Sequence, residues 1–336
     1  MATILSHIRY IAGAIAIACL VALAAPASAV AQQINPTADA VQEQKLLSEL
    51  NRITGRCTLP DQKACTLEQP AGRDWRYFHQ QTLPIIGAVS IIGMLVLLVL
   101  FYMIRGMVRI EHGRSGRVIV RFSMFERLVH WMTATCFIIL ALSGLNITFG
   151  KQVLLPLIGE QSFAEMSQWL KYSHNYLSFP FTLGVVLMFL MWIAWNIPTK
   201  VDVNWIKEGG GLVGDRHPPA ARFNAGQKMI YWVVVLGGAA AAVSGYLLMF
   251  PFYGTNIADM QLAQTVHAIV SMLFIAAMLA HIYIGTIGME GAVEAMWNGT
   301  VDVNWAKEHH SLWLAQEEAK GRVSGLPPEG RMQPAE

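Results

Sequence analysis

One stretch, residues 262–288, constrains the fold of this chain most strongly. Apart from two histidines it is almost wholly apolar, and it exceeds the roughly 20 residues that cross a bilayer as a helix. His267 and His281 are fourteen residues apart, which is nearly four helical turns, so they share one face about 21 Å apart. Intramembrane ionisable residues are usually functional, and imidazole is a common axial ligand of haem iron. We therefore expect one ligand for each of two haems; the alternative is two unrelated helix-end histidines.

The composition is that of a membrane protein. Of the 336 residues, 54% are hydrophobic and 14% are charged, and the mean hydropathy is +0.42. The four cysteines form neither a C-x-x-C nor a C-x-x-C-H motif, so the sequence indicates no iron–sulfur cluster, zinc site or covalently attached haem. Nucleotide-binding glycine motifs are also missing from the sequence, and no nucleic-acid partner is expected.

The N-terminal part resembles an export signal followed by an external segment. Residues 1–31 combine a basic start, an apolar run and a small-x-small cleavage site, which predicts a signal peptide; an uncleaved anchor is the alternative. Residues 32–83 are then periplasmic. Cys57 and Cys65 frame a short loop in this oxidising compartment, which favours a disulfide over two free thiols.

Residues 84–104 predict an additional transmembrane anchor helix without an internal ionisable residue. The following segment, 105–122, is expected to be a cytoplasmic loop, because six arginines lie between positions 105 and 127 and short Arg-rich loops stay on the cytoplasmic side. This side agrees with a chain that starts outside and crosses once.

Residues 123–288 predict four further transmembrane helices. Ser123 with Glu126, and Ser162 with Glu165, are candidate capping boxes that would begin the first two of them. The cytoplasmic connection 199–228 carries five Lys and Arg residues, whereas the external loops carry few. The tail, 289–336, is then cytoplasmic. The expected fold is an all-α membrane protein: a four-helix transmembrane bundle preceded by one extra helix and a signal peptide.

Depth along these helices sorts the intramembrane histidines into two pairs. Counted from Ser123, His130 is about 10 Å into the cytoplasmic leaflet, where His281 also lies. His174 and His267 lie in the outer leaflet. Each pair comes from two helices, as a six-coordinate bis-histidine haem requires. We therefore expect two b haems, each with two axial histidines, so that the four helices form a di-haem cytochrome b bundle.

The remaining histidines are expected to have no ligand role. Four lie in polar cytoplasmic stretches and are predicted to be solvated: His112, His217, His309 and His310. His79 lies outside, just before the anchor helix.

A second constellation begins the third bundle helix, at the depth of the cytoplasmic haem. Asn224 and Gln227 offer both hydrogen-bond donors and acceptors, and Lys228 offers a donor and a proton. Together they form a candidate quinone site. The alternative is an ordinary interfacial anchor.

One internal repeat follows two inward-running helices. The sequence Val-Asp-Val-Asn-Trp occurs at 201–205 and again at 301–305. Both copies are expected at the cytoplasmic face, as matching caps, a docking surface or two similar surface turns.

From about Arg121 to Leu314 the chain resembles the cytochrome b, or gamma, subunit of membrane-bound respiratory formate dehydrogenases. The resemblance lies in Arg-Leu-Val-His130-Trp, His174, Asn224-Ala-Gly-Gln227-Lys, the His267/His281 pair and Trp305-Ala-Lys-Glu-His-His310. The histidines alone would indicate only a wider group of di-haem four-helix cytochromes b, which also serves nickel–iron hydrogenases.

The resemblance implies a role in a bacterial inner-membrane complex. Electrons would pass from an iron–sulfur subunit through the outer haem (His174, His267) and the inner haem (His130, His281) to a quinone, menaquinone or ubiquinone. The resemblance also implies that the inner-haem ligand His281 joins Asn224 and Gln227 in the quinone site. A molybdenum or tungsten subunit would oxidise formate, and this chain has no residues for that chemistry. The alternatives are a cytochrome b of a hydrogenase or other periplasmic oxidoreductase, and a non-haem membrane transporter or scaffold.

Overall fold

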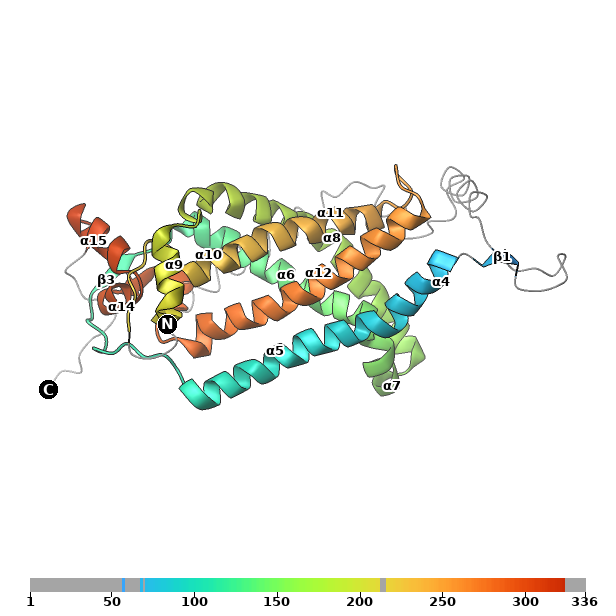
Figure 1. Ribbon diagram of the computed structural model, residues 1–336, viewed down its shortest axis with the longest axis horizontal. Coiled ribbons are helices and arrows are strands. Elements are labelled where there is room, and N and C mark those ends of the chain that lie inside the picture. The colour runs from blue at the N-terminus through green and yellow to red at the C-terminus, as the bar shows by residue number, and fades with distance from the viewer. Residues whose placement is uncertain (1–55, 58–66, 69, 212–215, 324–336) are drawn as a thin grey trace.

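The computed structural model describes residues 56–57, 67–68, 70–211 and 216–323. The predicted signal peptide and Cys65 lie outside these residues, so cleavage and the Cys57–Cys65 disulfide stay predictions. Figure 1 shows an elongated bundle of long helices, with α4 and α7 at one end and β3, α14 and α15 at the other. These ends are called the α7 end and the α15 end below.

Five helical segments among the described residues are long and apolar enough to cross a membrane, as the all-α membrane fold requires. The first comprises α4 (Pro70–Tyr77), a π-helical turn (Phe78–Thr82) and α5 (Leu83–Arg105). The others are α6 (Met124–Val153), α8 (Glu160–Trp192), α10 (Ala225–Trp232) continuing through a π-helical turn (Val233–Gly237) into α11 (Gly238–Met249), and α12 (Ile257–Tyr283) with a π-helical turn (Ile284–Gly288).

Short elements connect these spans. The helices are α7 (Leu155–Ile158), α9 (Lys200–Lys207), α13 (Glu294–Trp297), α14 (Val303–His309) and α15 (Ser311–Ala319), with 3₁₀ turns at Ile193–Trp195 and Gly209–Gly211. Strands β1 (Arg56–Cys57) and β2 (Leu67–Glu68) pair antiparallel, as do β3 (Val118–Val120) and β4 (Thr300–Asp302).

Side-chain caps determine where several helices begin. The predicted box of Ser123 and Glu126 is confirmed, since each side chain accepts from the other residue's backbone N–H. The predicted box at Ser162 and Glu165 is wrong. The reason is Gly159, whose positive φ of 80° turns the chain after α7, so that α8 already begins at Glu160.

The additional helix α5 lies along α12, the helix that carries His267 and His281 (Figure 1). At the α7 end, His79 Nε2 lies 3.1 Å from Gln264 Nε2. At the α15 end, Phe101 packs edge-on against Tyr283, with ring centroids 6.2 Å apart. The helix therefore supports α12 over its whole length and presents its other faces outward.

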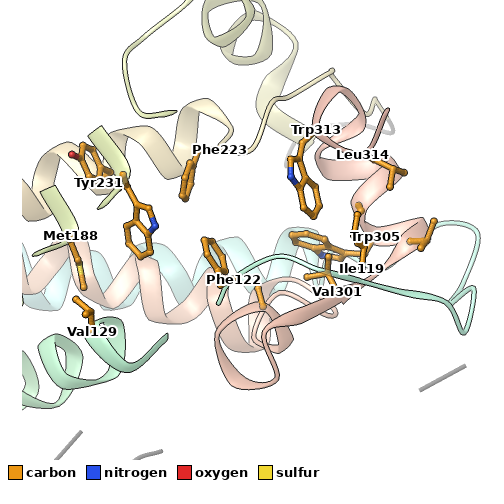
Figure 2. Close-up of a cluster of buried hydrophobic side chains, with 14 of the residues drawn as sticks. Ile119, Phe122, Val129, Met188, Phe223, Tyr231, Val301, Trp305, Trp313 and Leu314 are labelled. Carbon is orange, nitrogen blue, oxygen red and sulfur yellow. The ribbon is translucent and has the colours of Figure 1, made fainter. Parts of the chain in front are cut away.

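Two apolar clusters form the core. The central cluster lies within the bundle and comprises Met132, Cys136, Phe181, Val185, Phe274 and Met278. The larger cap cluster lies at the α15 end and joins the bundle to β3, β4, α14 and α15. Figure 2 shows it, with Phe122 facing Phe223 and the indoles of Trp305 and Trp313 in the same cluster.

The prediction that His309 and His310 are solvated is wrong. His309 is 7% exposed and His310 is fully buried. The reason is that α14 and α15 fold back onto the bundle: Val301 of β4 pairs with Ile119 of β3, so the tail becomes part of the cap cluster.

Candidate functional site

The four bundle histidines form two pairs at different depths. His130 of α6 and His281 of α12 face each other toward the α15 end, with ring centroids 6.3 Å apart. His174 of α8 and His267 of α12 face each other toward the α7 end, with centroids 6.1 Å apart. The helix α12 therefore contributes one imidazole to each pair.

These separations match those of two axial ligands on one iron. An imidazole nitrogen lies about 1.1 Å from its ring centre and a metal–imidazole bond is about 2.0 Å, so two such ligands have ring centres about 6.2 Å apart. Both pairs lie within a few tenths of an ångström of this value. The residues present therefore fit two six-coordinate haems.

Hydrogen bonds determine which nitrogen is available in the α7-end pair. His267 Nδ1 lies 2.9 Å from the carbonyl oxygen of Ala241, which can only accept, so Nδ1 carries the proton. His174 Nδ1 lies 2.8 Å from Ser143 Oγ. The Ser143 hydroxyl donates to the carbonyl of Ile139, so its oxygen accepts from His174. In both histidines Nε2 is left for a metal, as ligating histidines require.

Small residues make room next to the same pair. A methyl group added to Gly245 would lie 3.0 Å from Cε1 of His267, and one added to Gly144 would lie 3.5 Å from Cε1 of His174. Larger side chains at these positions would push on the imidazoles. Gly184 instead allows helix packing, since a methyl group there would overlap Thr133 of α6.

The α15-end pair has a different surrounding. His130 Nδ1 is buried and has no hydrogen-bond partner among the described residues. The neighbouring Trp131 packs edge-on against His130, with ring centroids 5.3 Å apart, and donates its indole N–H to the carbonyl of Met296. Trp131 therefore ties the position of this pair to α13.

Three phenylalanines separate the two pairs. Phe137 lies 4.7 Å from Phe274 and 6.2 Å from Phe181, and Phe181 lies 6.3 Å from Phe274, all between ring centroids. Each is seven residues, about two turns, from the histidine of its own helix, and Phe274 is seven from both His267 and His281. The space between the pairs is therefore filled by aromatic rings.

The second candidate site begins α10. Asn224 is the N-cap, and its Oδ1 accepts from the backbone N–H of Gln227 at 2.9 Å. In return, Gln227 Oε1 accepts from the backbone N–H of Asn224 at 3.2 Å. Because this capping box uses both amide oxygens, the two –NH₂ groups remain as the donors for a ligand.

Lys228 has a structural partner that the sequence did not suggest. Its ammonium is 2.7 Å from Asp202 Oδ2 and 3.0 Å from the carbonyl of Ile197, and the residue is 5% exposed. Burial opposes the charge on Asp202, but hydrogen bonds from Lys228 and Thr199 hold the pKa of Asp202 below its ordinary value. Lys228 therefore ties α10 to α9.

The sequence did not predict several contacts of the candidate-site residues. Ser143 and Ser244, which lies 3.2 Å from His267 Nδ1, are ordinary helix serines until the fold places them behind an imidazole. Arg121 belongs to an arginine-rich segment, and only the structure shows its guanidinium next to Gln227. A weak signal existed for His310, because it lies in the Trp-Ala-Lys-Glu-His-His motif.

Known proteins resemble the chain over the bundle. The family described as prokaryotic cytochrome b561 matches residues 121–299. The cytochrome b556(Fdn) subunit of the nitrate-inducible formate dehydrogenase of Escherichia coli K12 is 29% identical over 210 residues, which cover 61% of this chain and 94% of the relative. A second subunit from that strain, cytochrome b556(fdo) of formate dehydrogenase, is 28% identical over 59% of this chain and 92% of the relative.

The formate dehydrogenase cytochrome b556 subunit of Haemophilus influenzae is 27% identical over 63% of this chain and 88% of the relative. The family match includes all four paired histidines together with Asn224 and Gln227, and it leaves out α5, α14 and α15. Because the family match spans more than half of the sequence, this chain belongs to the prokaryotic cytochrome b561 family, whose members bind haem b.

Proposed function

We propose that this chain is the membrane-embedded electron-transfer subunit of a formate dehydrogenase complex, with two b haems and a quinone-reducing site. The two histidine pairs, at centroid separations of 6.1 and 6.3 Å, are the observation that carries this proposal. A cytochrome family excludes the non-haem transporter or scaffold. The formate dehydrogenase relatives favour formate over hydrogen as the electron source.

Four histidines would hold the haems: His174 with His267, and His130 with His281. When bound, a six-coordinate b haem supplies a one-electron carrier without an open position for oxygen chemistry. The chain's own residues orient the imidazoles through Nδ1 and exclude water between the pairs. No residue of this chain has a role in formate oxidation.

The proposed orientation places the α15 end in the cytoplasm of a bacterial inner membrane. The two segments richest in Lys and Arg, 105–127 and 199–228, contain β3 and α9 and lie at this end (Figure 1). Residues 32–83 would then be periplasmic. An iron–sulfur subunit would dock at the α7 end, next to the His174–His267 pair, and a molybdenum or tungsten subunit would supply its electrons.

The quinone, menaquinone or ubiquinone, would be reduced near the start of α10. The free –NH₂ groups of Asn224 and Gln227 suit the carbonyl oxygens of a quinone, and His281 completes the proposed site. Lys228, the third residue of the proposed site, would reach the quinone only when its ion pair with Asp202 opens.

Haem content tests the proposal most directly. The purified chain should release two b haems into acidified acetone, because they are not covalently bound. Ala at His174 or His267 should remove one haem, and combining both changes should remove no more. Ala at His267 together with Ala at His281 should remove both haems.

His112→Ala is a matched control, since that side chain is 75% exposed, and it should keep both haems. A single haem per chain, or loss of the same haem in the His267 and His281 variants, would contradict the proposed pairing.

A further inference from the structure

Arg121, just before α6, is a buried arginine held by aromatic rings. It is 3% exposed, and its guanidinium carbon lies 5.3 Å from the ring centroid of Phe122, 5.4 Å from Trp305 and 5.0 Å from Trp313. Two of these rings come from the tail of the chain and appear in the cap cluster of Figure 2. Cation–π contacts of this kind stabilise a desolvated guanidinium.

The hydrogen bonds of the Arg121 guanidinium all come from one nitrogen. Its Nη2 lies 2.7 Å from the carbonyl of Arg222, 3.0 Å from His310 Nε2 and 3.3 Å from Gln227 Oε1, while Nε and Nη1 are buried without a partner among the described residues. Nη2 carries two hydrogens for three acceptors, so one hydrogen is shared. The contact with Gln227 is the longest of the three.

His310 holds Arg121 in this position. Its Nδ1 lies 2.8 Å from the carbonyl of Ala221, which only accepts, so Nδ1 carries the proton and Nε2 must accept from the guanidinium. Burial, and then the charge of Arg121, keep the pKa of His310 well below its ordinary value, so the ring is neutral as this arrangement requires. Burial and the nearby Arg222 lower the pKa of Arg121 to about 9, which leaves it charged at neutral pH.

The carboxamide of Gln227 is what this network orients. Its Oε1 accepts from Arg121 and from the backbone N–H of Asn224, so the –NH₂ group must point away from both donors. A carboxamide without these contacts can rotate by half a turn and present its oxygen instead. An oxygen would repel a quinone carbonyl, whereas the –NH₂ group donates to it.

We infer that Arg121 and His310 are positioning residues of the quinone site, which hold the carboxamide of Gln227 with its –NH₂ group toward the quinone. The inference rests on the proposed function. It makes the tail helices α14 and α15 part of the quinone site, although the histidine pairs lie entirely within the bundle.

The test uses the assembled complex in its membrane, with formate as donor and decylubiquinone or menadione as acceptor. Gln227→Ala should raise the KM for the acceptor about tenfold, the loss expected for one hydrogen bond in a buried site, with both haems retained. Arg121→Lys keeps the charge, but its shorter side chain withdraws the donor from Gln227 Oε1, which is already the longest of the three contacts at 3.3 Å, so it should also raise KM. The double variant should be no worse than Gln227→Ala alone, because Arg121 acts through Gln227.

Two substitutions of His310 distinguish a positioning role from a general loss of structure. His310→Ala should raise KM, and His310→Gln, which can still donate to Ala221 and accept from Arg121, should restore most of it. Arg114→Lys is the matched control: it makes the same change at an arginine that pairs with Glu290 and Glu294 rather than with Gln227, and it should leave KM within about twofold.

The outcomes distinguish failure of the proposed quinone site from failure of the positioning role of Arg121 and His310. If Gln227→Ala leaves KM unchanged, the proposed quinone site is wrong and this inference falls with it. If Gln227→Ala raises KM but Arg121→Lys does not, or if the two effects multiply, only the positioning role is overturned. The positioning role would also be overturned if Arg121→Lys, His310→Ala and His310→Gln all lose haem while the KM for the acceptor stays unchanged.

Discussion

Two serine hydroxyls lie directly behind the imidazoles of the α7-end pair. Ser143 and Ser244 each donate to a carbonyl of their own helix, which leaves the hydroxyl oxygen free to accept from a histidine Nδ1–H. An acceptor behind a ligating histidine makes the imidazole more basic, and a more basic ligand stabilises ferric iron.

Ser143→Ala should therefore raise the midpoint potential of the haem that His174 and His267 are proposed to hold, while leaving the haem bound. The shift should be about 60 mV. Loss of a hydrogen-bond partner of a metal-ligating histidine typically has an effect of about tenfold, and a tenfold change in a one-electron equilibrium corresponds to about 59 mV. A redox titration of the haem absorbance measures it. Ser90→Ala is the control, since Ser90 donates only to Ile86 of α5, and an equal shift there would contradict the assignment.

The amide of Asn224 has two separable roles, because its oxygen caps α10 and its –NH₂ group is proposed to face the quinone. Asn224→Ser keeps a capping oxygen and removes the –NH₂ group, so stability should change by only a few tenths of a kcal/mol. Reoxidation of the haems by quinone should slow about tenfold, the effect of one lost donor.

Stopped-flow reoxidation after reduction by formate measures this rate. Asn256→Ser is a matched control, since Asn256 forms the same kind of capping box with Asp259 at the other end of the bundle. A normal rate of haem reoxidation in Asn224→Ser would show that the –NH₂ group of Asn224 does not belong to the quinone site.

At the scale of elements, the two copies of Val-Asp-Val-Asn-Trp adopt different structures. In the first copy all five residues lie in α9, where Asp202 caps the helix and pairs with Lys228. In the second copy, Val301 and Asp302 lie in β4 and α14 begins afterwards, because β3 is available as a partner. The same five-residue sequence therefore forms a helix or a strand depending on the element that packs next to it.

The ion pair of Asp202 with Lys228 joins α9 to α10, with both side chains about one-tenth exposed or less. Asp202→Ala should destabilise the protein by about 3 kcal/mol, because a buried ammonium is left without its partner. Lys228→Met added to Asp202→Ala should recover part of this loss. Thermal unfolding followed through haem release measures both variants.

The same pair predicts a pH dependence. The pKa of Asp202 lies below its ordinary 3.8, so its stabilising contribution is complete above about pH 4 and is lost as the pH falls through the folded-state pKa. Acid should therefore destabilise the wild type more than Asp202→Ala. Equal acid sensitivity would show that another group dominates.

For the whole molecule, the proposed function implies movement of charge across the membrane. Electrons that enter at the α7 end and reach a quinone at the α15 end cross most of the bilayer. Each electron does work of about 2.3 kcal/mol per 100 mV of membrane potential. Protons for the quinone would come from the side of the α15 end.

Formate oxidation by right-side-out vesicles should therefore generate a membrane potential, negative inside, and consume internal protons. A potential-sensitive dye and a trapped pH indicator measure the two quantities. Gln227→Ala should reduce both together with the rate of quinone reduction. Quinone reduction without a potential, or with protons taken from outside, would place the quinone site at the wrong end.

Hydrophobic length and helical periodicity were sufficient to predict the membrane spans and to assign the four histidines to two depths. Both properties are local: a run of apolar residues needs a bilayer-length helix, and residue number along a helix is distance. The capping box at Ser123 was predictable for the same reason, since its two partners are three residues apart.

Only the tertiary structure decided the surroundings of the polar groups. His309 and His310 are buried because β4 pairs with β3, which lies more than a hundred residues earlier in the sequence. Lys228 forms an ion pair with Asp202, which belongs to another helix. The partners of Arg121 come from α10 and from the tail. Whether a polar side chain is solvated, paired or part of a site depends on groups distant in sequence, because burial and hydrogen bonding are properties of the packed molecule rather than of a local pattern.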